Sequence, residues 1–377
     1  MTSTQRRTVG RSADRTTGRS EGSANAGLTA AADGLPFSPA DERESARVYV
    51  VAEIGVNHDG QLAKAIDLVE AAKYIGADAI KLQLFDPRLL LSRQAVLAEY
   101  QKASDSDVFA MLDRLKLGLD DMLAIRAATR RLDLDFVVTP FSMESHRTLE
   151  SLEPDVVKIA SPDAVNLPLL DMAASLGRPM IVSTGTAYLD ELAPCADRLR
   201  RHDAGGCLLH CVSSYPTPDE QASLGAMQAM AARFGLPVGY SDHTDERMTG
   251  ALAVAAGACV IEKHLTYDRT ASGPDHAASF DPRTFGDYVA FIRRAATMMG
   301  PRVKKPQQAE LEVRSICRQS VCACRDLDAG HVLTRDDLTV KRPGLGIPAA
   351  ELPAVVGRRL IHAVRSNDLL KQDDLAA

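Results

Sequence analysis

Short apolar runs alternate with longer stretches of mixed polarity from residue 47 to residue 299. The apolar runs are continuous rather than alternating with polar residues, which is typical of strands buried on both faces of a parallel sheet. The longer stretches carry apolar residues at helical spacing, and several of them stop at a glycine, a common helix C-cap. The pattern therefore predicts a regular succession of strands and helices.

Eight strands are predicted, and each is followed by a helix. The predicted strands cover residues 48–52, 79–84, 135–140, 156–161, 179–185, 207–212, 238–244 and 260–266. The predicted helices cover residues 62–75, 120–132, 145–152, 167–176, 189–201, 222–234, 248–257 and 281–299. Eight strand–helix units in roughly 250 residues indicate an α/β fold of the (β/α)₈ TIM-barrel type. An open, doubly wound sheet is the alternative, but residues 53–58 do not form the dinucleotide-binding turn that often follows its first strand.

The pattern changes on both sides of the predicted barrel, which spans residues 46–300. Residues 1–45 are rich in Arg, Ser, Thr, Gly and Ala and poor in large apolar residues, so we expect a disordered tail. Residues 301–314 are expected to form a linker. Residues 315–377 contain short apolar runs separated by turn residues, which predicts a small second domain with too little core to stand alone.

Composition excludes some functional classes. The net charge of −6 argues against nucleic-acid binding, because the chain has no basic excess. Apolar runs are far shorter than the roughly 20 residues that span a bilayer. The seven cysteines are scattered, and Cys322 and Cys324 do not have a zinc-binding spacing. We expect free thiols and a cytoplasmic location.

Polar side chains gather at the carboxyl ends of the predicted strands, where parallel barrels carry their active sites. His243 and His264 follow neighbouring strands, so their imidazoles could share one divalent cation. The alternative for either histidine is an ordinary hydrogen-bonded residue of the core or surface.

Two lysines, Lys81 and Lys158, lie within apolar strands, where an ammonium group without an anion is costly. One buried lysine could be a structural ion pair. Two that converge with several hydroxyls predict a cradle for a doubly charged group such as phosphate plus carboxylate. Four acidic residues nearby can bind metal, transfer protons or balance the lysines: Glu53, Asp242, Glu262 and Asp275.

Taken in order, the motifs at the strand ends resemble those of the sialic acid synthase family. The motifs are residues 52–58, 81–83, 139–142, 158–161, 183–185, 210–218, 239–244 and 262–266. Residues 341–344 resemble the same family's C-terminal antifreeze-like (SAF) domain. Two positions depart from the pattern: many members carry Glu in place of Asp163 and Asn in place of Ser213. Asp163 could instead be an N-cap for the helix that starts at residue 167.

The resemblance implies an enzyme that condenses phosphoenolpyruvate with an N-acylated amino-hexose aldehyde, such as N-acetylmannosamine, to give a nine-carbon 2-keto acid and phosphate. It implies that His243 and His264 bind Mn²⁺ or Mg²⁺. Phosphoenolpyruvate would be held by Lys81, Thr139, Lys158, Ser161, Ser183, Ser213 and Ser241. Catalytic or acceptor-facing roles would fall to Glu53, Lys81, Gln83, Lys158, Asp163, Tyr215, Asp275 and Arg342. Arg342 would come from the SAF domain of a partner subunit in a domain-swapped dimer.

Other functions stay open. A synthase that uses phosphoenolpyruvate to make another 2-keto-3-deoxy sugar acid, for polysaccharide or secondary-metabolite biosynthesis, would use the same site. A two-histidine metal hydrolase on the same barrel would leave the paired lysines and the hydroxyls unexplained. A sugar-binding or ice-binding protein whose function lies in the SAF-like domain would leave the polar residues at the strand ends unexplained.

Overall fold

The computed structural model describes residues 47–97, 101, 107–301 and 303–376. The chain divides into two compact units, Met1–Pro301 and Arg302–Ala377. The tail predicted over residues 1–45 lies outside the described residues.

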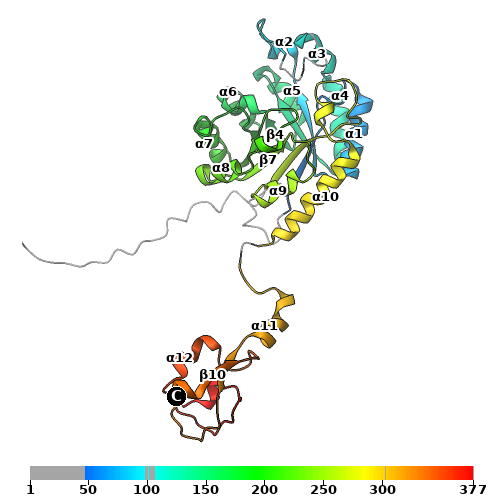
Figure 1. Ribbon diagram of the computed structural model, residues 1–377. Helices are drawn as coiled ribbons and strands as arrows, with labels where there is room; N and C mark the ends of the chain where they lie inside the picture. The colour runs from blue at the N-terminus through cyan, green and yellow to red at the C-terminus, as the bar shows by residue number, and fades with distance from the viewer. Residues whose placement is uncertain (1–46, 98–100, 102–106, 302, 377) are drawn as a thin grey trace, which may run out of the picture. The chain divides into compact units, whose positions relative to one another are not determined.

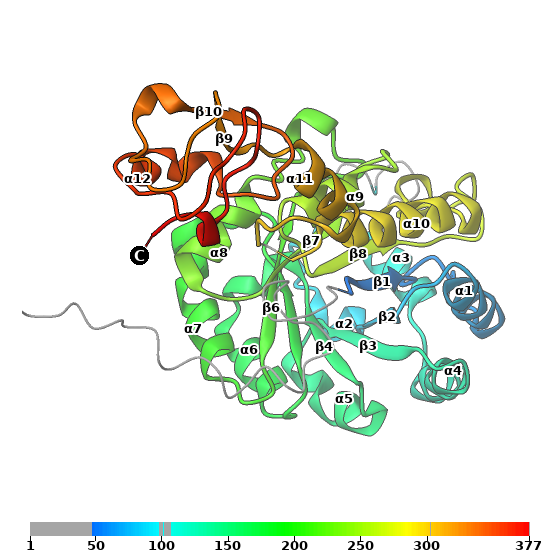
Figure 2. The same ribbon diagram turned by 90° about the horizontal axis from the view of Figure 1, so that it is seen from below.

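The first unit contains a closed barrel of eight parallel strands, each paired with the next in sequence (Figures 1 and 2). The strands are β1 (Tyr49–Glu53), β2 (Ala79–Leu84), β3 (Asp135–Pro140), β4 (Val156–Ile159), β5 (Met180–Ser183), β6 (Gly206–Cys211), β7 (Val238–Asp242) and β8 (Val260–His264). The barrel closes where β8 pairs with β1, with Glu53 opposite His264. The predicted (β/α)₈ fold is therefore confirmed.

Helices surround the strands, as Figure 2 shows. They are α1 (Leu62–Tyr74), α4 (Leu119–Arg131), α5 (His146–Leu152), α6 (Leu167–Ala174), α7 (Ala193–Arg201), α8 (Ala226–Phe234), α9 (Thr249–Ala255) and α10 (Pro282–Met299). Two α-helices begin four residues later than predicted. A 3₁₀ turn at Leu189–Leu192 precedes α7. Before α8, Ser223 has a φ of 47°, a left-handed conformation that an α-helix cannot contain.

The connection between β2 and α4 contains two helices that the hydrophobic pattern did not reveal, α2 (Pro87–Leu90) and α3 (Val108–Leu115). Asp86 and Asp107 cap them by accepting hydrogen bonds from backbone N–H groups of the first turn. Met111 and Leu115 of α3 are buried in a small cluster with Val56. The connection is thereby packed against the loop that follows β1, at the carboxyl end of the barrel.

The second unit contains a two-stranded antiparallel sheet, β9 (Ser320–Ala323) with β10 (Leu338–Lys341), and two short helices, α11 (Leu311–Cys317) and α12 (Leu352–Val355). Its own small core includes Val321, Leu338 and Leu370. Part of the linker predicted over residues 301–314 is helical, because α11 begins at Leu311 after a 3₁₀ turn at Gln308–Glu310.

All seven cysteines are free thiols. Among the described residues, the helices are too short or too polar to cross a membrane.

Candidate active site

The inward face of the barrel is apolar at its amino end and becomes polar two residues further along the strands. An inner core cluster contains Val51, Ala79, Val137, Val156, Ile181 and Val260. Side chains alternate between the two faces of a strand, so the residue two positions later points inward as well. Those residues are Glu53, Lys81, Thr139, Lys158, Ser183 and Glu262, and all are buried. The apolar cluster therefore lies directly beneath a layer of buried polar side chains.

Two lysines and two glutamates form an ion-pair network in this layer. The Lys81 ammonium lies 2.8 Å from Glu53 Oε2 and 3.3 Å from Glu262 Oε2. The Lys158 ammonium lies 3.3 Å from Glu262 Oε1, which also accepts a 2.9 Å hydrogen bond from Ser241. Glu262 thus bridges both lysines. From the sequence, Glu262 is one of four acidic residues that could balance the lysines, without a specific role, although its position two residues after Val260 places it on the inward face.

Burial and charge act against each other in this network. The pKa of Lys81 is lowered to about 8, mainly by burial; Lys158 adds to the lowering and Glu262 opposes it. Burial alone would raise the pKa of Glu262, but Lys158 and Lys81 hold it well below its usual range. Glu262 is therefore a carboxylate at neutral pH and keeps the two ammonium groups together despite their repulsion.

Several hydroxyls beside the lysines have hydrogen-bonding capacity to spare. Thr139 Oγ1 and Ser183 Oγ are buried without a hydrogen-bond partner. Ser161 accepts a 3.0 Å hydrogen bond from the Gly185 N–H. A Cβ at Gly185 would lie 2.4 Å from Ser213 Oγ and 2.9 Å from Ser161 Oγ, so glycine lets these two hydroxyls, which follow β6 and β4, come together. Buried donors without partners are costly, and an anion bound between the lysines would satisfy them.

The two histidines meet beside this cradle. Their ring centroids are 5.5 Å apart, and the Tyr215 ring lies 4.1 Å from that of His243. His243 Nδ1 donates a 2.8 Å hydrogen bond to the Val212 carbonyl, which leaves Nε2 with its lone pair. His264 Nδ1 is buried without a hydrogen-bond partner and lies 3.8 Å from Asp275 Oδ2.

These residues fit a divalent cation, although the protein supplies only part of a ligand set. Burial lowers the pKa of His264 well below its usual value, so its ring is neutral and able to bind metal. Burial raises the pKa of Asp275 to about 6. Among the described residues, no three His, Cys, Asp or Glu side chains are arranged to enclose a metal. A cation held by His243 and His264 would therefore keep positions for substrate or water, as catalytic metals do.

The NeuB family pattern matches residues 68–304, well over half of the chain, and the SAF domain pattern matches residues 318–376. The chain belongs to the NeuB family. It is 41% identical to an N,N'-diacetyllegionaminic acid synthase of Legionella pneumophila over 320 residues, 83% of this chain and 90% of the relative. A protein of the same name from Campylobacter jejuni is 36% identical over 332 residues, 86% of this chain and 99% of the relative.

A solved structure of the N-acetylneuraminic acid (sialic acid) synthetase from Leptospira borgpetersenii serovar Hardjo-bovis is similar in fold. Its TM-score is 0.65 at 31% identity, over 71% of this chain and 90% of that chain. The family resemblance inferred from the strand-end motifs is thus confirmed.

Two further side chains of this NeuB-family chain lie in the site. Gln83 is half-buried and donates 3.2 Å to Glu53 Oε1 and 3.1 Å to the Gly55 carbonyl. The Cys211 thiol, which sequence reasoning missed, lies 3.8 Å from His243 Nδ1. Burial would raise the pKa of Cys211, but His243, Ser161 and Lys158 together outweigh it and lower that pKa to about 7. Cys211 follows Leu209 by two residues, so the same alternation places it inward.

Asp163 does not cap α6, so the alternative suggested by the sequence is wrong. The cap is Asn166, whose Oδ1 accepts from the Leu169 N–H at 3.3 Å. Asp163 lies in a 3₁₀ turn after β4 and accepts a 3.0 Å hydrogen bond from the Asn166 amide. Burial raises its pKa. Asn166 caps α6 because it directly precedes the first helical residue, Leu167.

Arg342 belongs to the second unit, where it is exposed. With Arg318 and Gln319 it lines a cavity of about 400 Å³. Within that unit it is presented to solvent, away from the small core.

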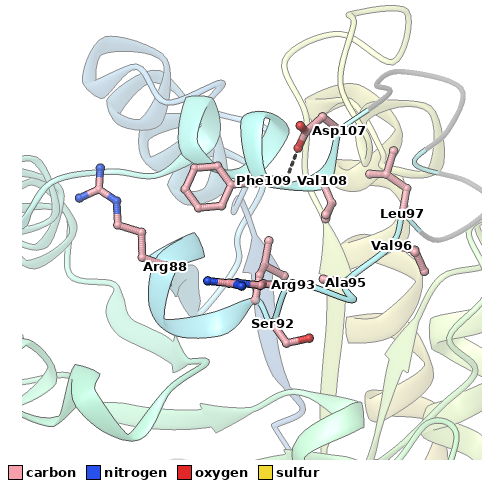
Figure 3. Close-up of a pocket in the computed structure, with 10 residues that line it drawn as sticks. Arg88, Ser92, Arg93, Ala95, Val96, Leu97, Asp107, Val108 and Phe109 are labelled. Atoms are coloured by element: carbon pink, nitrogen blue, oxygen red, sulfur yellow. Dashed lines mark hydrogen bonds between the residues drawn. The ribbon is translucent and has the colours of Figure 1, made fainter.

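A larger cavity, of about 890 Å³, lies in the connection between β2 and α4 (Figure 3). Its lining includes Arg88, Arg93, Val96 and Phe109, and it contains none of the predicted site residues. The size of a cavity is therefore a poor guide to the chemistry of this barrel, and the strand-end cluster is the candidate active site.

Proposed function

We propose that this protein condenses phosphoenolpyruvate with an N-acylated amino-hexose aldehyde to a nonulosonic acid and phosphate, as a carbon–carbon bond-forming transferase. The supporting observation is the cradle of Lys81, Lys158 and the unsatisfied hydroxyls of Thr139 and Ser183, next to paired histidines. The site combines a cradle for an anion with a pair of histidines that could hold a cation to polarise a carbonyl. A metal hydrolase would need only the histidine pair.

The residues of the cradle would hold the phosphate and carboxylate of phosphoenolpyruvate by charge and hydrogen bonds. A divalent cation bound by His243 and His264 supplies Lewis acidity toward the aldehyde oxygen. The enol carbon attacks the aldehyde carbon, water captures the cationic C2, and the adduct loses phosphate to give the 2-keto acid. With its pKa raised to about 6, Asp275 can take the proton from that water.

For the acceptor, we propose an amino-hexose with two acylated amino groups. Phosphoenolpyruvate contributes three carbons and no nitrogen, so both acetamido groups of an N,N'-diacetyl product must come from the six-carbon partner. Two N,N'-diacetyllegionaminic acid synthases share 41% and 36% identity with this chain. Asp163 is shorter than the Glu expected there, which leaves space for a larger acceptor.

The test is phosphate release from phosphoenolpyruvate with Mn²⁺ and a panel of sugars. The panel contains N-acetylmannosamine, its 6-phosphate, a di-N-acetylated amino-hexose and two neutral pentoses or hexoses without nitrogen. We expect the highest kcat/KM with the di-N-acetylated sugar. Equal or better turnover of sugars without nitrogen would instead assign the chain to another 2-keto-3-deoxy acid synthase. No phosphate release with any member would contradict the proposal.

The metal proposal has a separate test. His264→Ala should weaken Mn²⁺ binding, measured by calorimetry on metal-free protein, and should lower kcat at saturating phosphoenolpyruvate. Wild-type Mn²⁺ affinity in His264→Ala would remove the paired histidines from the metal site. Asp171→Ala is a suitable control, because its exposed carboxylate pairs with Arg198 and not with the histidines.

We also propose that Arg342 acts in trans, from a partner subunit in a domain-swapped dimer. Its planar group of donors suits the carbonyl of an acyl group. The test mixes wild-type protein with a Lys158→Met, Arg342→Ala double variant under subunit exchange. With donation in trans, each site of a mixed dimer carries one lesion and activity is lost. Half of the wild-type activity per mixed dimer would show donation in cis.

A further inference from the structure

The turn that follows β1, residues 57–60, connects several loops at the carboxyl end of the barrel. Asp59 and Gly60 have φ values of 53° and 69°, so the chain reverses sharply. A Cβ at Gly60 would lie 2.3 Å from the Arg114 carbonyl oxygen at the end of α3. The turn is therefore pressed against the β2–α4 connection on one side.

On the other side, the Asp59 carboxylate reaches the loop after β8. Oδ1 accepts a 3.0 Å hydrogen bond from His276 Nε2. Oδ2 accepts from Lys64 Nζ at 2.6 Å and from the Tyr267 hydroxyl at 2.7 Å. Burial opposes ionisation, but these donors together lower the pKa of Asp59, so it remains a carboxylate at neutral pH.

His276 is fixed at both of its ring nitrogens. A carboxylate only accepts, so Nε2 carries the proton toward Asp59, and Nδ1 lies 2.6 Å from the Thr266 hydroxyl. The ring is 1% exposed, and a Cβ at Gly273 would lie 2.7 Å from its Cδ2. His276 can hardly rotate, and it is the direct neighbour of Asp275.

Asn57 makes a second connection to the same loop. Its Nδ2 donates to the Leu265 carbonyl at 2.9 Å and to Ser279 Oγ at 2.8 Å. Ser279 in turn donates to the carbonyl of Asp275 at 2.6 Å. Asp275 is thus held from the turn twice, through its own carbonyl and through the side chain of the next residue.

These contacts determine where the Asp275 carboxyl can point, 3.8 Å from His264 Nδ1. We propose that Asp59 and Asn57 are positioning residues that hold Asp275 beside the paired histidines, where the acceptor sugar is bound. Neither one touches a reacting group, and the cradle for phosphoenolpyruvate is built from other strands. This inference rests on the proposed function, in which Asp275, beside the paired histidines, takes the proton from the water that attacks the adduct.

A double-mutant cycle tests the inference. Asp59→Ala, Asp275→Asn and the double variant are compared for phosphate release. Asp59→Ala should lower kcat/KM for the acceptor about 10- to 100-fold, as is usual for residues that orient a reactive group. The KM for phosphoenolpyruvate should stay within about twofold. In the Asp275→Asn background, Asp59→Ala should have no further effect, because it acts through Asp275.

Losses that multiply in the double variant, or an equal rise of both KM values, would overturn the inference in favour of a general loss of structure. His276→Gln, which can still donate to Asp59, should retain more acceptor kcat/KM than His276→Ala. Asp171→Ala is the matched control: it removes an exposed carboxylate paired with Arg198 and should change neither KM.

Amide hydrogen exchange gives a readout that does not depend on activity. Residues 275–279 should exchange faster in Asp59→Ala than in wild-type protein or Asp171→Ala. Unchanged exchange would contradict the inference even if the acceptor were unknown. If wild-type protein is inactive on all sugars while Asp59→Ala still exchanges faster than wild type over residues 275–279, the result would refute the proposed function alone.

Discussion

Two clusters of buried charge lie on opposite faces of β7 and β8, and they differ in how fully their polar atoms are paired. Ser241 and Glu262 face the barrel interior. Asp242 and Lys263, the next residues in sequence, face the surrounding helices, where Asp242 accepts from the Tyr288 hydroxyl of α10 at 2.6 Å. We call these the inner and the outer cluster.

The outer cluster is complete. Asp242 Oδ1 accepts from the N–H and the hydroxyl of Thr244, both at 2.8 Å, while its Oδ2 lies 3.5 Å from the Lys263 ammonium. Lys263 also donates to the Thr244 carbonyl and lies over the Phe280 ring. Every polar group has a partner within the fold, so this cluster joins the barrel to α10.

The inner cluster has capacity left over. Glu53 Oε2 and Glu262 Oε2 are paired only with the Lys81 ammonium, and the buried hydroxyls of Thr139 and Ser183 have no hydrogen-bond partner. Buried polar atoms nearly always have hydrogen-bond partners, so buried hydroxyls without a partner indicate a place where a ligand binds. Burial of charge is therefore common to both clusters, and unsatisfied hydrogen bonding distinguishes the active site.

The largest effect is expected when one lysine of the inner cluster is replaced. Lys158→Met should lower kcat/KM for phosphoenolpyruvate by about 100-fold or more, because losing one partner of a buried charge pair costs about 2–5 kcal/mol. The loss should appear mainly in the KM for phosphoenolpyruvate, measured by phosphate release. An unchanged KM for phosphoenolpyruvate would remove Lys158 from the cradle.

The matching change in the outer cluster should act on folding instead. Lys263→Met leaves Asp242 buried without its cation and should lower the free energy of unfolding by about 3–5 kcal/mol, measured by urea titration. The protein that remains folded should keep wild-type KM values. A large rise in the KM for phosphoenolpyruvate with normal stability would mean that the two clusters do not differ in role.

The sequence allowed the barrel to be predicted because each strand is a separate apolar run and each helix an amphipathic one. It also allowed most inward residues to be found, since Lys81 and Lys158 stand out within apolar strands. It did not separate Glu262, which faces the interior, from Asp242, which faces the surrounding helices. The two-residue alternation from Val260 would have assigned Glu262 to the interior, where it lies 3.3 Å from both lysines.

Other features depended on contacts between distant segments. The hydrogen bonds of Asp59 to His276 and of Asn57 to Ser279 join residues more than two hundred positions apart. Whether a hydroxyl such as Thr139 finds a partner depends on the spacing of neighbouring strands. The short helices α2 and α3 are marginal by themselves and are stabilised by caps and by burial of Met111 and Leu115, so periodicity was too weak to reveal them.

The smallest expected difference between the two clusters is in the pH dependence of activity. Burial lowers the pKa of Lys81 to about 8, well below the ordinary value of about 10.4 for a lysine. Below pH 8 the ammonium is charged and attracts phosphoenolpyruvate; above it the proton is lost and the attraction with it. The kcat/KM for phosphoenolpyruvate, which reports the free enzyme, should therefore fall above about pH 8, by up to about tenfold per pH unit.

The pKa of Lys263 is lowered too, first of all by burial, but that residue faces away from the substrate. The alkaline fall in kcat/KM should therefore persist in Lys263→Met and disappear in Lys81→Met, whose activity should be low and independent of pH between 7 and about 9.5. The phosphate of the substrate does not contribute, because its second pKa is about 6. A fall that survives in Lys81→Met would assign the ionisation to another group and weaken the distinction between the inner and outer clusters.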